Sequence, residues 1–169
     1  MPRSAITALL VGALLVWTPS VPAAESGDAT HQHPRKTAKK TRASVEKPFG
    51  RPGDPRKVKR AIAIDMSDAM RFFPENVSVK RGDTVRFKLR NSGQLPHEMV
   101  IGTMDDLKKH AALMKRSPQM DHHDHQAVHV GPGETAGLVW QFTKPGEFYF
   151  ACLLSGHFDA GMIGTIVVR

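Results

Sequence analysis

The sequence has little of several features that would widen the choice of folds and functions. It contains one cysteine, Cys152, and one tyrosine among 169 residues. A single cysteine cannot form a disulfide within its own chain, and it excludes a binuclear metal centre built on two cysteines. The apolar run at residues 5–17 is also shorter than the about 20 residues that a transmembrane helix needs. We therefore expect neither a disulfide within the chain nor a membrane-spanning helix at residues 5–17.

Most of the chain lacks a net charge, although the whole sequence carries +8. Residues 24–60 contain 11 basic and 4 acidic side chains, whereas residues 61–169 contain 12 of each. A neutral domain with one cationic arm argues against a nucleic-acid-binding surface. The arm is instead expected to associate weakly with anionic lipid headgroups or with an acidic partner.

The N-terminal part is typical of an exported protein. A short basic start is followed by the apolar run and by Val21-Pro22-Ala23, a small-residue cleavage site. We interpret residues 1–23 as a signal peptide, which predicts a periplasmic location. Residues 24–59 are rich in lysine, arginine and proline, with few large apolar side chains, which predicts a disordered basic linker. The folded domain is expected to cover residues 60–169.

The pattern of the folded part indicates an all-β protein. Residues 84–90 alternate with period two, so Val85, Phe87 and Leu89 are expected to face the core. Short runs of this kind are separated by Gly/Pro turns and predict a β-sandwich of about seven or eight strands. One helix is predicted between the strands. A capping pattern starts at Thr103, and an apolar stripe of helical spacing follows it and ends before Pro118.

Three side chains near the C-terminus have the chemistry of metal ligands. Cys152, His157 and Met162 lie at equal intervals between two predicted strands. A thiolate and a thioether favour Cu(I), and imidazole suits both oxidation states of copper. This loop therefore predicts a mononuclear copper site that lacks only a second imidazole.

The spacing Cys152-x4-His157-x4-Met162 resembles the ligand loop of cupredoxins, the type 1 copper proteins that include plastocyanin, azurin and rusticyanin. Its four-residue gap between cysteine and histidine is most similar to the rusticyanin pattern. The resemblance implies a Greek-key sandwich and one type 1 copper ion. It also implies that His97, Cys152 and His157 are the equatorial ligands and that Met162 is the weak axial ligand.

Further motifs are similar to those of the periplasmic copper-tolerance cupredoxins of the CopI type. They include Val128-His129-Val130 before Gly131-Pro132-Gly133, and Phe150-Ala151-Cys152-Leu153. This resemblance implies copper handling in the cell envelope. The chain departs from the azurin pattern in having Glu98 rather than asparagine after the first ligand histidine, with Asn91 as a candidate substitute for its hydrogen bond to the cysteine sulfur.

A second group of possible ligands precedes the strand predicted at residues 127–130. It comprises four histidines: His122, His123, His125 and His129. Imidazole binds Cu(II), Zn(II) and Ni(II), so this segment is a candidate secondary metal site that could take additional copper. The alternative is a solvated polar loop.

Two functions remain open at this point, copper tolerance and electron transfer. We favour copper tolerance because of the histidine-rich segment, with a soluble periplasmic electron carrier as the alternative. The expected partners are copper ions and a redox protein, and a monomer is expected. Ala151 and Leu153 flank the cysteine where multicopper oxidases and nitrite reductases have a bridging histidine, which argues against an enzyme.

Overall fold

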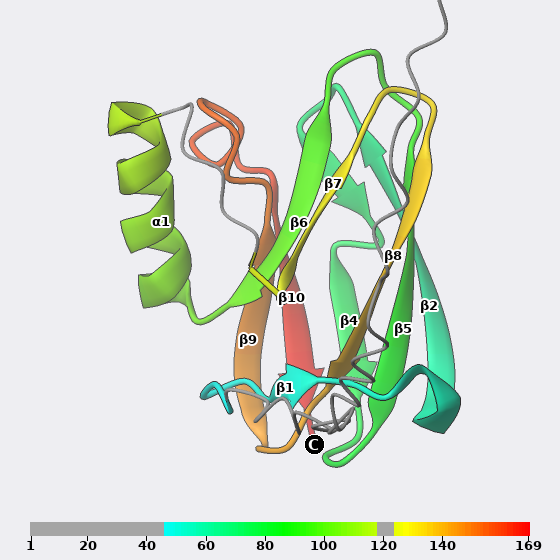
Figure 1. Cartoon of the computed structure of the whole chain (residues 1–169). Helices are drawn as coiled ribbons and strands as arrows, with labels where there is room; N and C mark the ends of the chain where they lie inside the picture. The colour runs from blue at the N-terminus through cyan, green and yellow to red at the C-terminus, as the bar shows by residue number, and fades with distance from the viewer. Residues whose placement is uncertain (1–45, 118–123) are drawn as a thin grey trace, which may run out of the picture. The chain divides into compact units, whose positions relative to one another are not determined.

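The computed structural model describes residues 46–117 and 124–169. Their strands form two five-stranded sheets that pack face to face (Figure 1). One sheet has the order β1-β8-β5-β2-β3, and the other has the order β4-β10-β9-β6-β7. The predicted all-β sandwich is confirmed. The predicted signal peptide and the linker up to residue 45 lie outside the described residues.

The elements follow one another in the chain with short connections. Their bounds are β1 Arg51–Pro52, the 3-10 turn η1 Pro55–Lys57, β2 Val58–Ser67, β3 Arg71–Phe73, β4 Asn76–Val79, β5 Thr84–Asn91, β6 His97–Gly102, α1 Met104–Arg116, β7 Ala127–Val130, β8 Thr135–Gln141, β9 Gly146–Ala151 and β10 Ile163–Val168. Two pairs are parallel, β2 with β5 and β4 with β10, and the other pairs are antiparallel. The strand count exceeds the expected seven or eight because β1 and β3 have only two and three residues.

Period-two alternation places the core between the sheets. Val85, Phe87 and Leu89 are buried as predicted, whereas Lys88 and Arg90 are exposed and Arg86 is half-buried. The segment before residue 60 adds to this core. Phe49 stacks on the Trp140 ring at 5.4 Å between centroids, and Trp140 Nε1 donates a hydrogen bond to the Phe49 carbonyl. Residues 46–59, which composition assigns to the linker, contain β1 and η1.

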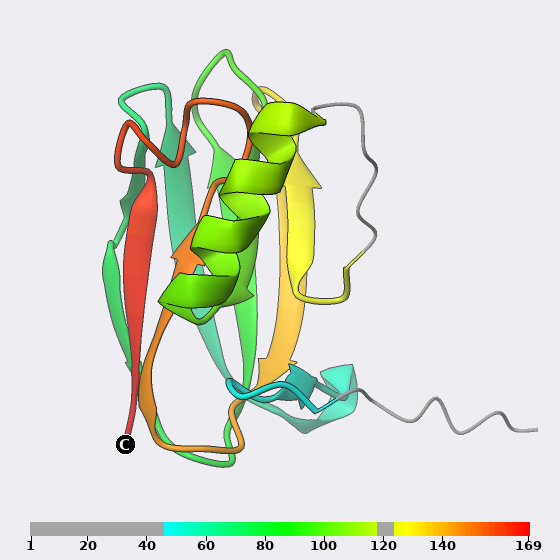
Figure 2. The ribbon, with the colours of Figure 1, turned by 90° about the vertical axis from the view of Figure 1, so that its left-hand side faces the viewer.

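The inserted helix α1 lies against the sheet that contains β6 and β9 (Figure 2). Thr103 caps it, because its hydroxyl oxygen accepts a hydrogen bond from the Asp106 N–H. Its buried side chains pack on Val100, Ala151 and Leu153; they are Leu107, Ala111 and Met114. The helix thus supports the residues on either side of Cys152. No helix in the described ranges is long and apolar enough to cross a bilayer.

Candidate metal centre

The loop between β9 and β10 folds back on itself at one end of the sandwich, the upper end in Figure 1. The Cys152 N–H donates to the Met162 carbonyl at 3.1 Å, and the Met162 N–H donates to the His157 carbonyl at 3.1 Å. Gly156 has φ +89°, a left-handed conformation that side-chain-bearing residues rarely adopt. These contacts hold the three candidate ligands of the loop, Cys152, His157 and Met162, on one compact turn.

The fourth candidate ligand reaches the same end from the other direction. His97 is the first residue of β6, and β6 pairs with β9 through Val100 and Ala151. The loop before His97 is shaped by Asn91, whose side-chain amide donates to the carbonyls of Leu95 and Val130. Both N–H groups of the Asn91 side chain are therefore used by these carbonyls. The expectation that Asn91 donates a hydrogen bond to the cysteine sulfur is wrong.

The structure brings together three of the predicted ligand side chains. The donor atoms of His97, Cys152 and His157 all lie within 4.8 Å of one another. Cys152 Sγ is 3.3 Å from His157 Nδ1. Metal–nitrogen and metal–sulfur bonds are about 2.0–2.3 Å long, as zinc sites show, so one cation can lie within reach of all three donors.

The burial of these side chains favours a dry site with one open edge. His97, Cys152 and Met162 are fully buried, whereas His157 is half-buried. The His97 Nδ1 atom is buried and has no hydrogen-bond partner among the described residues. A buried polar atom without a partner is unfavourable, and a metal ion would relieve it. The residues present therefore fit a copper ion.

Asp68 fixes the orientation of the His97 ring. Its carboxylate accepts hydrogen bonds from the N–H groups of Gln94 and Leu95, and one oxygen lies 3.2 Å from His97 Nε2. These contacts, first of all the one from Gln94, hold the pKa of Asp68 below its usual value, so the carboxylate is ionised. An Nε2–H group facing a carboxylate leaves the Nδ1 lone pair available for a metal.

Comparison with known proteins agrees with this geometry. The family described as copper binding proteins, plastocyanin/azurin family, matches residues 58–169. This chain belongs to that family. It is a copper-binding cupredoxin.

Relatives of this cupredoxin include proteins named copper-resistant cuproprotein CopI. The protein of that name from Rubrivivax gelatinosus is 49% identical over 142 residues, which cover 84% of this chain and 86% of the relative. Another from Pseudomonas aeruginosa is 33% identical over 150 residues and covers 72% of this chain and 82% of the relative. Among solved structures, the auracyanin of Roseiflexus castenholzii matches with a TM-score of 0.58 at 20% identity, covering 66% of this chain and 98% of that chain.

Glu98 links β6, which carries His97, to the loop that carries Cys152. It is only 4% exposed, and its Oε1 atom accepts a hydrogen bond from the Leu153 N–H at 2.9 Å. Its Oε2 atom lies 3.3 Å from Nδ1 of His129, an exposed residue of β7. The sequence marked Glu98 as unusual but gave no partner for it, because the pairing of residues 98 and 153 depends on how β6 and β9 meet.

Burial changes the proton affinities of two candidate ligands in opposite directions. Burial raises the pKa of the Cys152 thiol to about 12, so the thiol is protonated at neutral pH in the absence of a metal. Burial lowers the pKa of His157, with the neighbouring His97 contributing, so its imidazole is neutral and ready to bind. Binding of copper by the Cys152 thiolate would therefore release one proton.

The candidate secondary site is only partly covered by the structure. His122 and His123 lie outside the described residues. His125 is exposed in the turn before β7, and His129 points a ring nitrogen at Glu98. Within residues 46–117 and 124–169, a close group of three or more histidine, cysteine or carboxylate donors is found only at the His97, Cys152 and His157 centre.

Proposed function

We propose that this protein is an exported, periplasmic cupredoxin of copper tolerance, which holds one redox-active copper ion through His97, Cys152, His157 and Met162. The observation that carries the proposal is the convergence of three donors from two distant segments within 4.8 Å. Two relatives that cover most of the chain are named as copper-resistant proteins, which supports the tolerance role. Residues 1–23 direct export in this proposal.

Met162 completes the donor set. It is fully buried, and its main chain is hydrogen-bonded to both Cys152 and His157. A thioether is a soft, weak ligand that would suit copper beside a thiolate. Copper bound here supplies reversible one-electron chemistry.

The protein's own residues keep water away from this site and fix the donors. Phe150 is fully buried and meets Phe72 edge-on, at 4.9 Å between ring centroids. Ala151 and Leu153 are held by α1, as described above. Because backbone hydrogen bonds join Cys152 to Met162 and Met162 to His157, the loop would need little rearrangement when the oxidation state of copper changes.

Titration of the metal-free protein with Cu(II) tests the site. An intense visible charge-transfer band from a thiolate to copper, saturating at one ion for this centre, is the expected result. A colourless product would contradict it. The tolerance role is tested separately by deleting the gene in its host, which is expected to lower the copper concentration that stops growth; an unchanged concentration would remove that role while leaving the site intact.

An electron carrier with a separate redox partner is the second candidate. It is favoured by the half-buried His157, which offers an edge for electron transfer, and by Leu95, which is 44% exposed beside the His97 loop. A carrier needs one copper ion and a defined potential, whereas a tolerance protein gains from further capacity. In this proposal His122, His123, His125 and His129 supply that capacity for additional copper.

Copper stoichiometry separates the two roles. Elemental analysis of the copper-saturated protein is expected to give more than one ion per chain, with the excess lost when His122, His123, His125 and His129 are replaced by glutamine, which leaves the backbone of β7 in place. The visible band serves as the control, because it reports the main centre alone. One ion per chain in both proteins would favour the carrier.

A further inference from the structure

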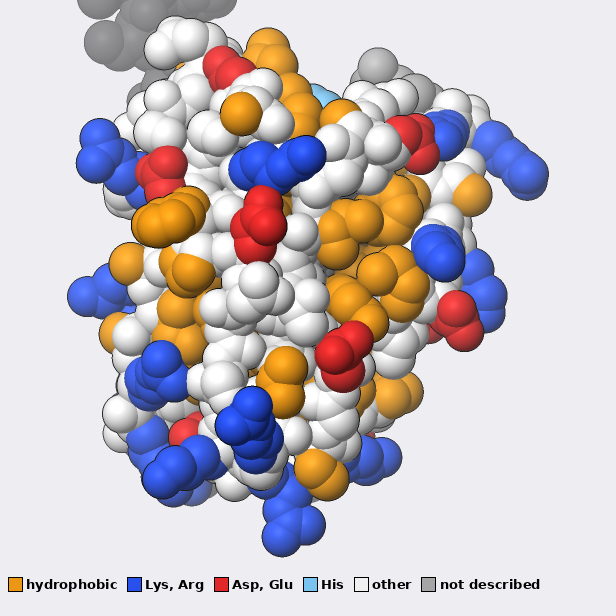
Figure 3. All heavy atoms as spheres, turned by 180° about the vertical axis from the view of Figure 1, so that it is seen from behind, with side chains coloured by type: hydrophobic (Ala, Val, Ile, Leu, Met, Phe, Trp, Pro, Cys, Tyr) orange, Lys and Arg blue, Asp and Glu red, His pale blue; other side chains and the backbone are white. Residues whose placement is uncertain are grey.

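The end of the sandwich opposite the candidate metal centre is rich in cations. We define the basal pole as residues 57–60, 80–83, 144–147 and 169. Backbone pairing brings these segments together: the Arg81 N–H donates to the Arg169 carbonyl, and the register of β10 places Val168 beside Gly146 and Val79. Figure 1 shows the C-terminus at this end, and Figure 3 shows Lys and Arg side chains gathered at the lower end of the molecule.

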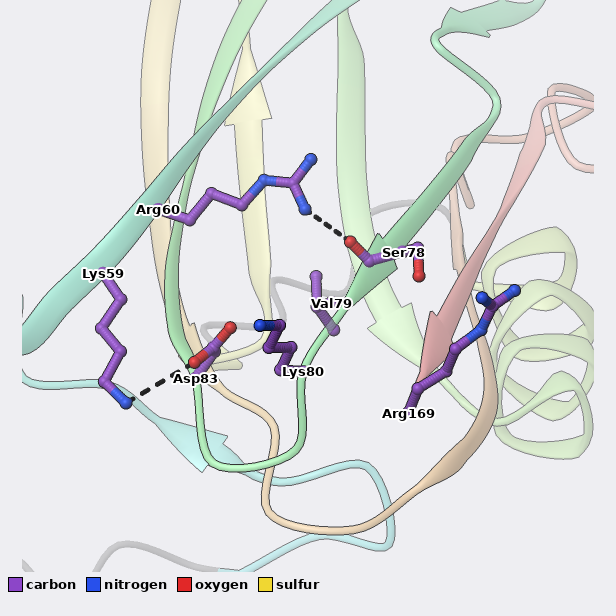
Figure 4. Close-up of a pocket in the computed structure, with 7 residues that line it drawn as sticks. All are labelled: Lys59, Arg60, Ser78, Val79, Lys80, Asp83 and Arg169. Atoms are coloured by element: carbon purple, nitrogen blue, oxygen red, sulfur yellow. Dashed lines mark hydrogen bonds and ion pairs between the residues drawn. The ribbon is translucent and has the colours of Figure 1, made fainter.

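A groove lies within the basal pole. It encloses about 700 Å³ between the start of β2, the β4–β5 turn and the end of β10 (Figure 4). Its cations come from all three segments: Lys59, Arg60, Lys80 and Arg169. Asp83 is the one acidic side chain in the lining, and it pairs with Lys59 at 3.6 Å.

The positive charge of the pole is largely uncompensated. The exposed cations are Lys57, Lys59, Arg60, Lys80, Arg81, Lys144 and Arg169, whereas the acidic side chains of the pole are Asp83 and Glu147. Arg60 donates to the Ser78 carbonyl, and Lys80 and Arg169 form no ion pair with any described residue. Within residues 61–169, which carry no net charge, the pole has four of these cations against two acidic side chains, a net +2, so the rest of that range carries a net −2.

The chain that precedes the pole extends the same charge. Residues 24–56 contain 8 basic and 4 acidic side chains, a net +4, and they come before β2 in the chain, whose first residues line the groove. A polybasic segment continuous with a cationic surface is the pattern that binds anionic membranes, to which each Lys or Arg near the surface adds attraction.

The pole lacks what a protein partner normally needs. Protein interfaces have an apolar core that carries much of the affinity. The large exposed apolar side chains among the described residues are Phe73, Leu95 and Leu113, and none of them lines the groove. Attraction to a lipid surface by charge alone needs no such core.

We propose that the basal pole docks on the headgroups of anionic phospholipids. Docking in this orientation leaves the copper-binding end, at the opposite end of the strands, facing away from the membrane. The half-buried His157 is thereby accessible from the aqueous side.

Vesicle sedimentation tests the proposal with the copper-loaded protein. Binding is expected to vesicles with about 30% phosphatidylglycerol in phosphatidylcholine, to be absent with phosphatidylcholine alone, and to fall steeply as salt is raised. Lys80→Glu/Arg169→Glu is the test variant, and Lys88→Glu/Arg90→Glu on β5 is the control with the same change in net charge. Each cation near the surface typically changes the vesicle-binding constant about fivefold. The binding constant of the test variant is therefore expected to fall at least about tenfold, and that of the control less than about twofold.

Three outcomes would overturn the proposal. Equal losses in both variants would mean that net charge alone governs binding. No enrichment on the anionic vesicles would leave an acidic protein as the partner to seek. Unchanged binding by the test variant, with complete loss when Lys36, Lys39, Lys40 and Arg42 are changed to glutamine, would assign binding to the preceding segment alone. An unchanged visible copper band in every variant serves as the check on folding.

Discussion

The two ends of this sandwich use the same strands for opposite purposes. At the copper-binding end, three of the four candidate ligands, His97, Cys152 and Met162, are fully buried, and carboxylates beside them make specific hydrogen bonds. At the basal pole, cations are exposed and come from four segments of the chain. The first end recognises a ligand by geometry, and the second is suited to recognition by summed charge. Single substitutions should therefore act very differently at the two ends.

The largest effect is expected from Cys152→Ser. A serine hydroxyl is not ionised at neutral pH and is a harder ligand than a thiolate, so the visible charge-transfer band should disappear completely on addition of Cu(II). Absorption spectroscopy measures this directly. The matched comparison is Lys80→Glu/Arg169→Glu at the other end, which should keep the band at full intensity; a band that survives in the serine variant would remove Cys152 from the ligand set.

The second largest effect is expected from a substitution at Asp68, which contacts the candidate ligand His97. Asp68→Asn removes the charge beside His97 Nε2 and keeps only one of the two oxygens that accept separately from the Gln94 and Leu95 N–H groups. Loss of such a partner typically weakens metal affinity by about 10–100-fold. Competition with a Cu(II) chelator measures the affinity. Asp65→Asn is the control, because Asp65 accepts from the Ser92 hydroxyl and does not contact a candidate ligand; equal affinities for both variants would contradict the role of Asp68.

The candidate site also sets a direction for the effect of pH. The raised pKa of Cys152, about 12, means that the metal-free thiol is protonated and that copper binding releases its proton. Copper affinity should therefore rise about tenfold per pH unit between about pH 7 and pH 9, where the neutral His157 releases no further proton. For the same reason, the metal-free fold should lose stability as pH rises from the ordinary thiol value of 9.0 toward 12. An affinity independent of pH would mean that the thiol is already ionised.

Sequence and structure agree best where the signal is local. Period-two alternation predicted the buried face of β5, and the capping pattern at Thr103 predicted the start of α1, because each depends on residues a few positions apart. The three donors of the ligand loop were also visible as a spacing. The place of His97 came from resemblance to a family, since no local pattern links residues 97 and 152.

Contacts between distant segments could not be predicted in this way. Asp68 precedes His97 by 29 positions, and its role depends on the turn between β2 and β3 lying beside the His97 loop. Composition places Phe49 in a polar linker, yet its ring stacks on Trp140. The sequence indicates only a basic N-terminal segment. The fold is needed to show that Lys80 and Arg169 line the same groove as Lys59.

The smallest effect is expected from a single neutral substitution at the basal pole. Lys80→Gln removes one of seven exposed cations and leaves the others in place, so binding to phosphatidylglycerol vesicles should fall by about fivefold or less. Lys88→Gln on β5 is the control and should change binding less. If Lys80→Gln alone abolished binding, the pole would act as a specific site with fixed geometry, like the copper end, rather than through summed charge. A graded loss, repeated when Arg169→Gln is added, would preserve the contrast between the two ends.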